Sequence, residues 1–500
     1  MRVTARVLMV VGTASSVGKS VLVTALCRIF SDLGVRVAPF KAQNMSNNAA
    51  VTADGLEIGR AQAEQAAAAR VEPTVEMNPV LLKPQGDRTS QLIVDGRPAG
   101  VLRAIDFIER KRDLWPHVER ALATLREQYD LVIVEGAGSP AEPNLQAGDI
   151  VNMRVARHTR AVTLLAGDID RGGVFAHFLG TLDLMTPEDR ELVRGLIINR
   201  FRGDPSLLQP AIDVIEARGG VPVLGIVPWI DHLGVADEDA QSLERASAAA
   251  APGAADVDVA VMRLPRIANF DDVDPLLSEP GVRVRWVESA AAIGTPDLIV
   301  IPGTKATVAD LAWLREHGLD RAIAARVEAG AHLLGICGGY QMLGERLLDP
   351  EGVEAAPGTV VAGLALLPDT TEFATAKETH RTSGIMRAVP GAWAGAAGEA
   401  VRGYEIHMGR TTTTAAPLID LEGRTDGAVS ADGRVAGTYL HGLLHNDSLR
   451  RALLSGLGRR GEASSGDSEA ARTAAFDRLA AVVRGSIDID RVRAMLEAER

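Results

Sequence analysis

The chain has 500 residues, of which 46% are apolar and 24% charged, and its formal net charge is −12. A hydrophobic core stops growing at roughly 250–300 residues, so this length predicts more than one folded domain. The acidic balance disfavours nucleic acid as a partner, because that binding depends on Lys and Arg that neutralise phosphates. Any anionic substrate must therefore be held by local arginines or by a metal ion.

Signals of membrane insertion and secretion are weak. The longest apolar runs, such as residues 7–11 and 298–301, fall far short of the roughly 20 residues that span a bilayer. Residues 1–11 run into a Gly-rich motif without a small-residue cleavage site, which favours a first strand over a signal peptide. Two cysteines, Cys27 and Cys337, are few for a disulfide-stapled secreted protein. We expect a cytoplasmic protein without a membrane span; the sequence predicts no oligomeric state.

Residues 1–234 have the pattern of a mostly parallel, doubly wound α/β domain. Near-continuous apolar runs alternate with helix-length amphipathic stretches, as expected of buried parallel strands. Six runs are predicted to be strands: VLMVVG, VRVAPFK, LVIVEGAG, AVTLLAGD, VRGLIINR and VPVLGIVP. Residues 235–256 lose this periodicity and gain Ala, Ser, Asp and Glu, so we interpret them as a linker.

Residues 257–455 repeat the alternation and predict a second α/β domain. Its strand candidates are DVAVMRL, VRVRWVES, DLIVIPG and HLLGIC, each followed by turn residues and a helical pattern. In the tail, residues 456–500, the side chains of Phe476, Leu479 and Val483 fall on one helical face. We expect the tail to be a docked helix.

A phosphate-binding loop follows the first strand. The segment GTASSVGKS, residues 12–20, lies between an apolar strand and an apolar helix, which is the setting that a P-loop requires. Backbone N–H groups would hold phosphates, Lys19 would reach the β and γ oxygens, and Ser20 would ligate Mg²⁺. A plain Gly/Ser turn is the alternative. The residues expected to contact ATP are Gly12, Thr13, Ser16, Val17, Gly18, Lys19 and Ser20.

The spacing of this loop departs from the standard P-loop. Five residues rather than four separate Gly12 from Gly18, and Thr13 occupies the usual glycine position. In this the loop resembles the dethiobiotin synthetase group of ATP-dependent ligases rather than motor ATPases. Asn199, at the end of the strand GLIIN, resembles the adenine-contacting Asn of that group, and a turn-capping Asn is the open alternative.

Two carboxylates are candidates for the Mg²⁺ ligands, together with Ser20. Glu135 ends the strand LVIVE, at the sheet edge where ligands of open α/β sheets bind. Asp54 is the second, because a hard cation beside a triphosphate takes one or two protein carboxylates. The alternatives are that Glu135 caps a helix and that Asp54 forms a turn before Gly55.

The second domain carries a nucleophile motif, GICGGYQ at residues 335–341. Cys337 lies between an apolar strand and a helix, so the helix dipole favours its thiolate. Glycines on both sides permit a strained elbow and let a substrate carbonyl approach the backbone. The motif is similar to that of class I glutamine amidotransferases; a structural cysteine in a tight turn is the alternative.

This resemblance assigns further roles. Gly303, in the segment IPGT, would supply its N–H with that of Gly338 as an oxyanion hole, and Gln341 would contact the bound glutamine. His441, in the segment GTYLHG, would serve as the base and then as the acid for the leaving ammonia. A histidine satisfied within the core is the alternative for His441.

The sequence departs from the amidotransferase pattern after His441. Most class I members carry a Glu two residues later, whereas position 443 is Leu. This leaves a Cys–His dyad without a third member, an omission also known in the cobyrinate-amidating members. A dyad remains workable, because a thiol is easier to activate than a hydroxyl. His407 and His445 are weaker candidates for the base, and Cys27 is expected to be core packing.

An ATP site that can activate a carboxylate, joined to a site that frees ammonia from glutamine, specifies amide synthesis on a carboxylic acid. Taken whole, the chain resembles the cobyric acid synthase family nearly end to end. The matching segments are FKAQNMSNN, EMNPVLLKP, VEGAGSPAE, GDIDRGGVF, INRFRGD, IPGTKATVADLAWLR and GYEIHMG. The resemblance implies amidation of the b, d, e and g carboxylates of adenosylcobyrinic acid a,c-diamide, with ATP, Mg²⁺ and glutamine, to give adenosylcobyric acid.

Corrinoid contacts are expected in matching segments without an ATP or glutamine role. Gln43, Asn44 and Asn47 could bind existing amides, and Arg171 stands beside two glycines where a carboxylate or phosphoryl oxygen could approach. A capped loop and a surface ion pair are the structural alternatives. Two other functions stay open: cobyrinic acid a,c-diamide synthase, and a non-catalytic P-loop regulatory ATPase with a degenerate glutaminase-like domain.

Overall fold

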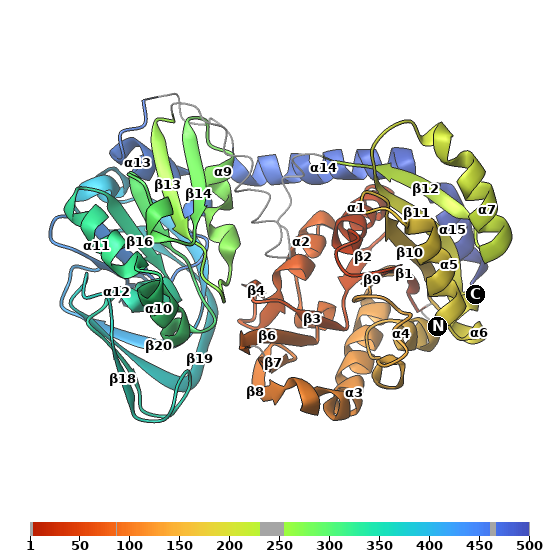
Figure 1. Cartoon of the computed structure of the whole chain (residues 1–500), viewed down its shortest axis with the longest axis horizontal. Helices are drawn as coiled ribbons and strands as arrows, with labels where there is room; N and C mark the ends of the chain where they lie inside the picture. Colours follow the sequence, from red (N-terminus) through yellow and green to blue (C-terminus); the bar gives the residue numbers. More distant parts are fainter. Residues whose placement is uncertain (1–3, 87, 231–254, 461–466, 500) are drawn as a thin grey trace.

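The computed structural model describes residues 4–86, 88–230, 255–460 and 467–499. Figure 1 shows two α/β bodies beside each other, with a long helix that starts at the edge of one body and runs over the other. We call residues 4–230 the first body and residues 255–460 the second body. The linker expected at residues 235–256 lies almost entirely outside the described residues.

A six-stranded parallel sheet forms the centre of the first body. Its strand order is β12-β11-β10-β1-β9-β2, and each adjacent pair is parallel. The strands are β1 (Arg6–Gly12), β2 (Val37–Phe40), β9 (Leu131–Glu135), β10 (Val162–Asp168), β11 (Val193–Phe201) and β12 (Val223–Pro228). The doubly wound fold predicted for this part of the chain and its six strands are confirmed.

Helices on both faces bury this sheet. Met9 and Val11 of β1 belong to one apolar cluster and Leu8 and Val10 to another, so successive residues face opposite helix layers. This is why the strands read as continuous apolar runs. The helices are α1 (Lys19–Asp32), α2 (Arg60–Ala68), α3 (Ala104–Gln128), α4 (Met153–Thr159), α5 (Val174–Leu184), α6 (Pro187–Leu192) and α7 (Gln209–Gly219).

Two small sheets, which the sequence did not predict, extend the first body toward the second (Figure 1). One is β3-β6-β7-β8 and the other is the antiparallel pair β4-β5. Their strands are β3 (Gln43–Met45), β4 (Ala49–Val51), β5 (Glu57–Gly59), β6 (Val80–Gly86), β7 (Thr89–Val94) and β8 (Arg97–Arg103). Ala49 and Leu81 of these sheets pack with Tyr404 and Ile406 of the second body, so the two bodies share an apolar contact.

The second body is built on another mostly parallel sheet, in the order β14-β13-β15-β16-β24-β23, with β23 antiparallel. Its strands are β13 (Val257–Met262), β14 (Val282–Val287), β15 (Leu298–Ile301), β16 (His332–Ile336), β23 (Ala428–Val429) and β24 (Val435–Thr438). The helices of this body are α9 (Asp274–Leu277), α10 (Thr307–Glu316), α11 (Leu319–Glu328), α12 (Gly338–Leu343) and α13 (Asp447–Gly456). The four predicted strands of this part of the chain are confirmed.

A further sheet of the second body was also not predicted. It has the order β18-β17-β19-β21-β22, with β20 paired to β19. The strands are β17 (Arg346–Asp349), β18 (Thr359–Ala362), β19 (Asp369–Met386), β20 (Ala400–Thr413), β21 (Ile419–Leu421) and β22 (Arg424–Asp426). Strand β20 brings residues 404–408 to the boundary between the bodies.

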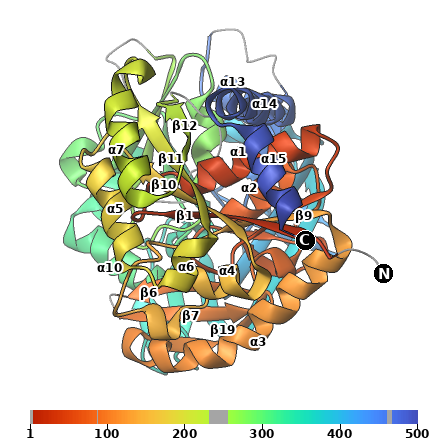
Figure 2. The ribbon, with the colours of Figure 1, turned by 90° about the vertical axis from the view of Figure 1, so that its right-hand side faces the viewer.

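The tail forms two helices, α14 (Ser468–Ser486) and α15 (Ile489–Ala498), that dock on the first body beside α1 (Figure 2). Phe476, Leu479 and Val483 are buried in one cluster with residues of α1, as their common helical face predicted. The start of α14 contacts the second body, where the Ser468 hydroxyl donates to Asp447 of α13 at 2.5 Å. No helix among the described residues is long and apolar enough to cross a membrane.

Candidate functional site

The loop at residues 12–20 joins the carboxyl end of β1 to α1 as a compact turn. Gly18 caps α1 with a left-handed φ of 93°. A Cβ on Gly12 would lie 2.6 Å from Val17 Cγ2, so only glycine fits there. Lys19 Nζ donates to the carbonyl oxygens of Ala14 at 3.0 Å and Gly138 at 3.2 Å, which places the ammonium between the loop and the segment after β9.

Glu135 lies at the carboxyl end of β9, next to this loop, as its position in the sequence indicated. Its Oε1 accepts a hydrogen bond from the Ser20 hydroxyl at 2.9 Å and pairs with Lys41 Nζ at 2.9 Å. Its Oε2 accepts from Gln65 Nε2 at 2.6 Å. Burial alone would raise the pKa of Glu135, but Lys41 and the hydrogen bonds from Gln65 and Ser20 lower it, so the carboxylate stays charged.

The hydrogen-bond partner of Asp54 belongs to its own turn, not to this cluster. Asp54 lies in the turn between β4 and β5, where its Oδ1 accepts a hydrogen bond from the Thr52 hydroxyl at 2.5 Å. The adjacent Gly55 lies against the Thr379 carbonyl of the second body, 3.2 Å from a Cβ built on the glycine. Among the described residues no hydrogen bond or ion pair joins Asp54 to Glu135. The hairpin places Asp54 near the domain boundary, and its role as a Mg²⁺ ligand stays a prediction.

Asn199 braces the phosphate loop from β11. Its Nδ2 donates to the Val17 carbonyl oxygen at 2.8 Å, and a Cβ on Gly18 would lie 2.3 Å from that nitrogen. Asn199 is 5% exposed, so the contact is buried. The side chain therefore supports the loop at the place where a nucleotide would lie.

Cys337 forms the expected strained elbow between β16 and α12. Its φ of 53° and ψ of −110° lie in a region that non-glycine residues rarely adopt. The flanking chain is pressed against β15, because a Cβ on Gly339 would lie 2.0 Å from the Ile301 carbonyl oxygen. The Cys337 N–H donates to the Thr438 carbonyl oxygen of β24 at 2.8 Å, which places the cysteine beside the strand that leads to His441.

His441 and Cys337 meet beside Gly303. A Cβ built on Gly303 would lie 3.0 Å from His441 Cε1 and 3.8 Å from Cys337 Cβ, so any larger residue would fill the space between them. Gly338 is next to this point, because a Cβ there would lie 2.7 Å from Thr304 Cγ2. The two glycines that were expected to supply the oxyanion hole are therefore neighbours of the thiol.

An aspartate that the sequence did not reveal orients this histidine. Asp272, in the short helix η4 (Phe270–Val273), places its Oδ2 2.7 Å from His441 Nδ1 and its Oδ1 2.7 Å from the Gly442 N–H. Both side chains are 2% exposed. The dyad interpretation is thereby corrected: a Cys–His–Asp arrangement is present, and its carboxylate comes from η4 instead of position 443.

The electrostatics of this trio favour a protonated imidazole. Burial alone would lower the pKa of His441, but Asp272 and Cys337 outweigh burial and raise it to about 10. Because His441 Nδ1 faces the Asp272 carboxylate, Nε2 is the ring nitrogen that can exchange a proton with the Cys337 sulfur. The arrangement can therefore exchange a proton between sulfur and imidazole.

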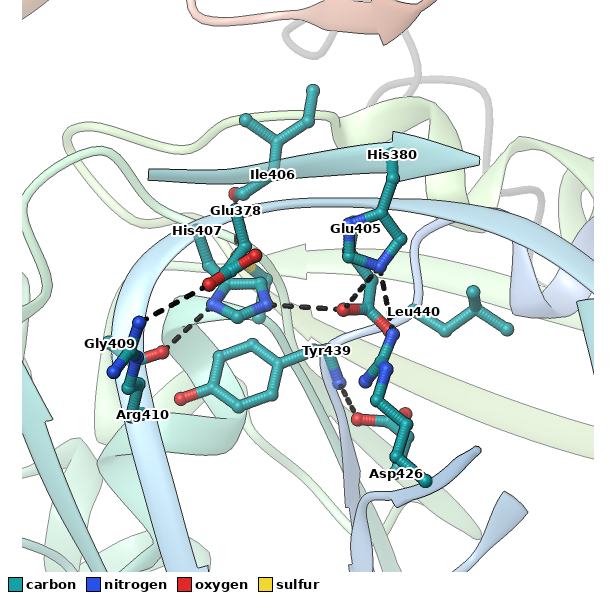
Figure 3. A network of polar contacts seen from close by, with 12 residues as sticks. Glu378, His380, Glu405, Ile406, His407, Gly409, Arg410, Asp426, Tyr439 and Leu440 are labelled. Atoms are coloured by element: carbon teal, nitrogen blue, oxygen red, sulfur yellow. Dashed lines mark hydrogen bonds and ion pairs between the residues drawn. The ribbon is translucent and has the colours of Figure 1, made fainter. Parts of the chain in front are cut away.

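His407 has partners other than the thiol (Figure 3). Its Nδ1 lies 2.8 Å from the Gly409 carbonyl oxygen and its Nε2 lies 3.3 Å from Glu405 Oε2. Its ring stacks on Tyr439 with a centroid separation of 3.9 Å. Both ring nitrogens of His407 have hydrogen-bond partners, so this residue lines the site and does not serve as its base.

The remaining candidates are occupied elsewhere as well. His445 Nε2 lies 2.9 Å from the Asp271 carbonyl oxygen. Cys27 is fully buried in the apolar cluster around α1, and burial raises the pKa of its thiol, which agrees with core packing.

A pocket beside Cys337 is shared by the two bodies. Lys83 and Gln85 of β6 in the first body form part of its wall. Gln341 is fixed there, accepting from the Thr307 hydroxyl at 2.9 Å and donating to the Tyr439 hydroxyl at 3.3 Å. The residues of the second body that line it are Ala268, Asn269, Gly303, Thr304, Lys305, Thr307, Cys337, Gln341, Val353, Glu354, Phe373, Lys377, Ile406, His407, Met408 and His441.

The residues proposed to contact the corrinoid lie in two places. Gln43 and Asn44 lie on β3 and are 8% and 2% exposed, and Asn44 Nδ2 donates to Gln62 Oε1 at 3.0 Å. The buried oxygens Gln43 Oε1 and Asn47 Oδ1 have no hydrogen-bond partner within the part of the chain that the structure describes. Arg171 follows β10, a neighbour of β1, so it lies at the same sheet edge as the phosphate loop.

Three residues of these sites were missed by the sequence analysis: Lys41, Gln65 and Asp272. Lys41 directly follows the strand β2 and Gln65 lies in an Ala-rich helix, where neither spacing nor charge marked them. Asp272 belongs to an adjacent Asp pair that follows the apolar residue Phe270. This pair of adjacent carboxylates was the indication that the sequence offered.

The comparisons with known proteins agree with this division. Residues 8–243 match the family described as CobQ/CobB/MinD/ParA nucleotide binding domain, and residues 258–449 match the CobB/CobQ-like glutamine amidotransferase domain. A curated protein named cobyric acid synthase from Chloroflexus aurantiacus is 54% identical, over 98% of this chain and 99% of its own. Relatives with the same name from Roseiflexus castenholzii and Sorangium cellulosum are 53% and 52% identical, with at least 98% of each chain covered. The chain therefore belongs to the cobyric acid synthase family.

Proposed function

We propose that this protein amidates carboxylate side chains of a corrinoid in cobalamin biosynthesis, with nitrogen from glutamine and energy from ATP. The observation that carries the proposal is the pocket beside Cys337, whose wall includes Lys83 and Gln85 of the nucleotide-binding body. Ammonia released there emerges next to the body that activates the acceptor. Residues 1–234, which contain the first body, are proposed as the synthetase domain, and residues 257–455 as the amidotransferase domain.

In the synthetase half, a corrinoid carboxylate oxygen attacks the γ-phosphorus of ATP and ADP leaves. Ammonia then attacks the acyl phosphate, an amide bond forms and phosphate is released. Lys19 would stabilise charge on the transferred group, and the backbone of the loop would hold the phosphates. Mg²⁺ fits the hard oxygen donors of Ser20 and Glu135, since the carboxylate is kept ionised, and it would neutralise charge on the phosphates.

In the amidotransferase half, the Cys337 sulfur attacks the amide carbonyl of glutamine. The N–H groups beside Gly303 and Gly338 would stabilise the oxyanion, and His441 would protonate the departing ammonia. Water, deprotonated by His441, then hydrolyses the thioester to glutamate. Lys305 and Glu354, a basic and an acidic side chain that line the same pocket, suit the α-carboxylate and α-ammonium groups of glutamine.

The specific acceptor we propose is adenosylcobyrinic acid a,c-diamide, amidated at its b, d, e and g carboxylates. The relatives at 52–54% identity all carry the name cobyric acid synthase, which favours this acceptor over an a,c-diamide synthase reaction. Mass spectrometry of the corrinoid product tests it. We expect replacement of OH by NH₂ at four carboxylates of the diamide when ATP, Mg²⁺ and glutamine are present. Conversion of cobyrinic acid only as far as its a,c-diamide would contradict the proposal.

Replacing Asp272 with Asn is expected to lower glutamine hydrolysis by roughly a hundredfold, because the imidazole loses the group that orients it and stabilises its positive charge. The pKa of His441 is raised by Asp272, so removal of the carboxylate lowers it. As the pH rises, His441 of the variant therefore loses its proton at a lower pH than His441 of the wild type. The alkaline limb of kcat/KM against pH, measured by glutamate release, should move toward neutrality.

Position 443 provides the matched control for this prediction. Leu443 occupies the place of the usual amidotransferase glutamate, and it is buried at 1% exposure in the apolar core. Leu443→Met keeps the volume and should leave glutamate release and its pH profile near those of the wild type. A normal pH profile in Asp272→Asn, together with a shifted one in Leu443→Met, would show that the orienting group is assigned wrongly.

A further inference from the structure

The helix η4, which carries Asp272, is held from the other side of the domain boundary. Arg60, the first residue of α2 in the first body, forms an ion pair with Asp271 through its Nη2. The Ala49 N–H of β4 donates to Asn269 Oδ1 at 2.8 Å. Two residues shortly before Asp272 in the chain, Asn269 and Asp271, therefore have partners in the synthetase domain.

Arg60 is also connected to the catalytic histidine, through the ring of Tyr404. Its Nη2 donates to the Tyr404 hydroxyl at 2.8 Å. The Tyr404 ring stacks on the His441 ring, with centroids 5.2 Å apart and an interplanar angle of 18°. The two residues also exchange backbone hydrogen bonds of 3.1 and 2.9 Å. One guanidinium thus connects the residue next to Asp272 with the residue stacked on His441.

The charge balance explains why a cation is needed there. Asp271 is 6% exposed at its side chain and Arg60 is 17% exposed, so water does little to solvate either group. Asp274, which faces the same cluster, has its pKa raised well above its usual value by burial and by Asp271. Removing the guanidinium would leave the charge of Asp271 buried and uncompensated, a change that is strongly destabilising for the local structure.

We propose that Arg60 of the synthetase domain is a positioning residue for glutamine hydrolysis, which acts by holding η4 and Tyr404 so that Asp272 and His441 keep their alignment. This inference rests on the proposed glutaminase function of Cys337. Arg60 touches neither the sulfur nor a reacting atom; its effect passes through the two groups that it holds. The glutaminase centre is complete only when the synthetase domain is docked against it.

The helix that carries Arg60 also contacts the phosphate site. Farther along α2, Gln65 donates to Glu135 at 2.6 Å, at the phosphate site. The Arg60 N–H also donates to the Asn48 carbonyl oxygen at 3.2 Å. A single helix of the first body is therefore anchored at both candidate sites.

The test compares Arg60→Gln and Arg60→Lys in the full chain, with glutamate release and ammonia-driven corrinoid amidation measured separately. We expect Arg60→Gln to lower kcat for glutamate release by about tenfold to a hundredfold, the cost of a small misalignment, with little change in KM for glutamine. Ammonia-driven amidation should stay within about twofold of the wild type. Arg60→Lys, which keeps the charge, should recover part of the loss.

Two further readouts separate a positioning role from a structural one. The alkaline limb of the pH profile of Arg60→Gln should move in the same direction as that of Asp272→Asn. The double variant Arg60→Gln/Asp272→Asn should be no slower than Asp272→Asn alone, because both changes disable the same alignment. Multiplicative losses, or an unchanged pH profile, would overturn the inference.

Arg381 supplies the matched control at the same boundary. It also reaches across, donating through Nε to the Val51 carbonyl oxygen at 2.7 Å and pairing with Glu72 at 3.1 Å, without contacting η4. Arg381→Gln should retain normal glutamate release. An equal loss in Arg381→Gln and Arg60→Gln would show that general docking of the domains, not Arg60, is responsible. Glutamate release by Cys337→Ser would instead overturn the proposed glutaminase site itself.

Discussion

Replacing Cys337 with Ser is expected to abolish glutamine-dependent amidation while amidation from free ammonia continues. A thiol titrates at about 8.5 and yields a thiolate, whereas a serine hydroxyl is essentially never ionised at neutral pH, so attack on the glutamine amide fails. The elbow at this position, with φ of 53°, tolerates Ser as well as Cys, because the two side chains have the same branching. The measurement is corrinoid amide formation with glutamine and then with excess ammonium at mildly alkaline pH.

The second cysteine is the control for this experiment. Cys27→Ala removes a thiol that α1 buries in the core and should retain glutamine-dependent activity, with only a loss of stability. Retention of glutamine use by Cys337→Ser would remove that residue as the nucleophile. Loss of both nitrogen sources in a folded Cys337→Ser protein would mean that the two half-reactions are not separable in the way proposed.

The central sheets were predictable because their strands are buried on both faces. Leu8, Met9, Val10 and Val11 are all fully buried in β1, so the sequence shows an unbroken apolar run. The strand β19 (Asp369–Met386) has the opposite character. It includes the polar run TAKETHRTS, is partly exposed along its length and is held by pairing with β20. Such a strand leaves no apolar periodicity, so the sheets at the domain boundary were missed.

The site residues divide according to how local their geometry is. Lys19 and Cys337 lie in strand–turn–helix motifs, where the spacing along the chain fixes the position of the side chain. Asp272 lies 169 residues before its partner His441, and the contact forms only when η4 folds against the end of β24. Asp54 lies in the turn of the hairpin between β4 and β5, whose strands the sequence did not predict, so its surroundings could not be predicted either.

Replacing Lys19 with Ala is expected to lower amidation by about 10³-fold with either nitrogen source, because the transferred phosphoryl group loses its charge partner within the loop. The ammonium group lies between the carbonyl oxygens of Ala14 and Gly138, at 3.0 and 3.2 Å, so its removal also leaves those loop contacts unmade. The measurement is corrinoid amide formation with glutamine and with ammonium, accompanied by ADP release.

The distinguishing feature of the Lys19→Ala result is that ammonium does not rescue it, unlike the loss in Cys337→Ser. Glutamate release measured without nucleotide should persist, because Cys337 and His441 belong to the other body. Arg36→Ala is the control, since Arg36 is an exposed cation of the same body, 63% exposed and paired with Asp130, and its loss should change neither activity. Normal amidation by Lys19→Ala would disprove the phosphate-loop assignment, because no other change in that variant could supply the missing charge.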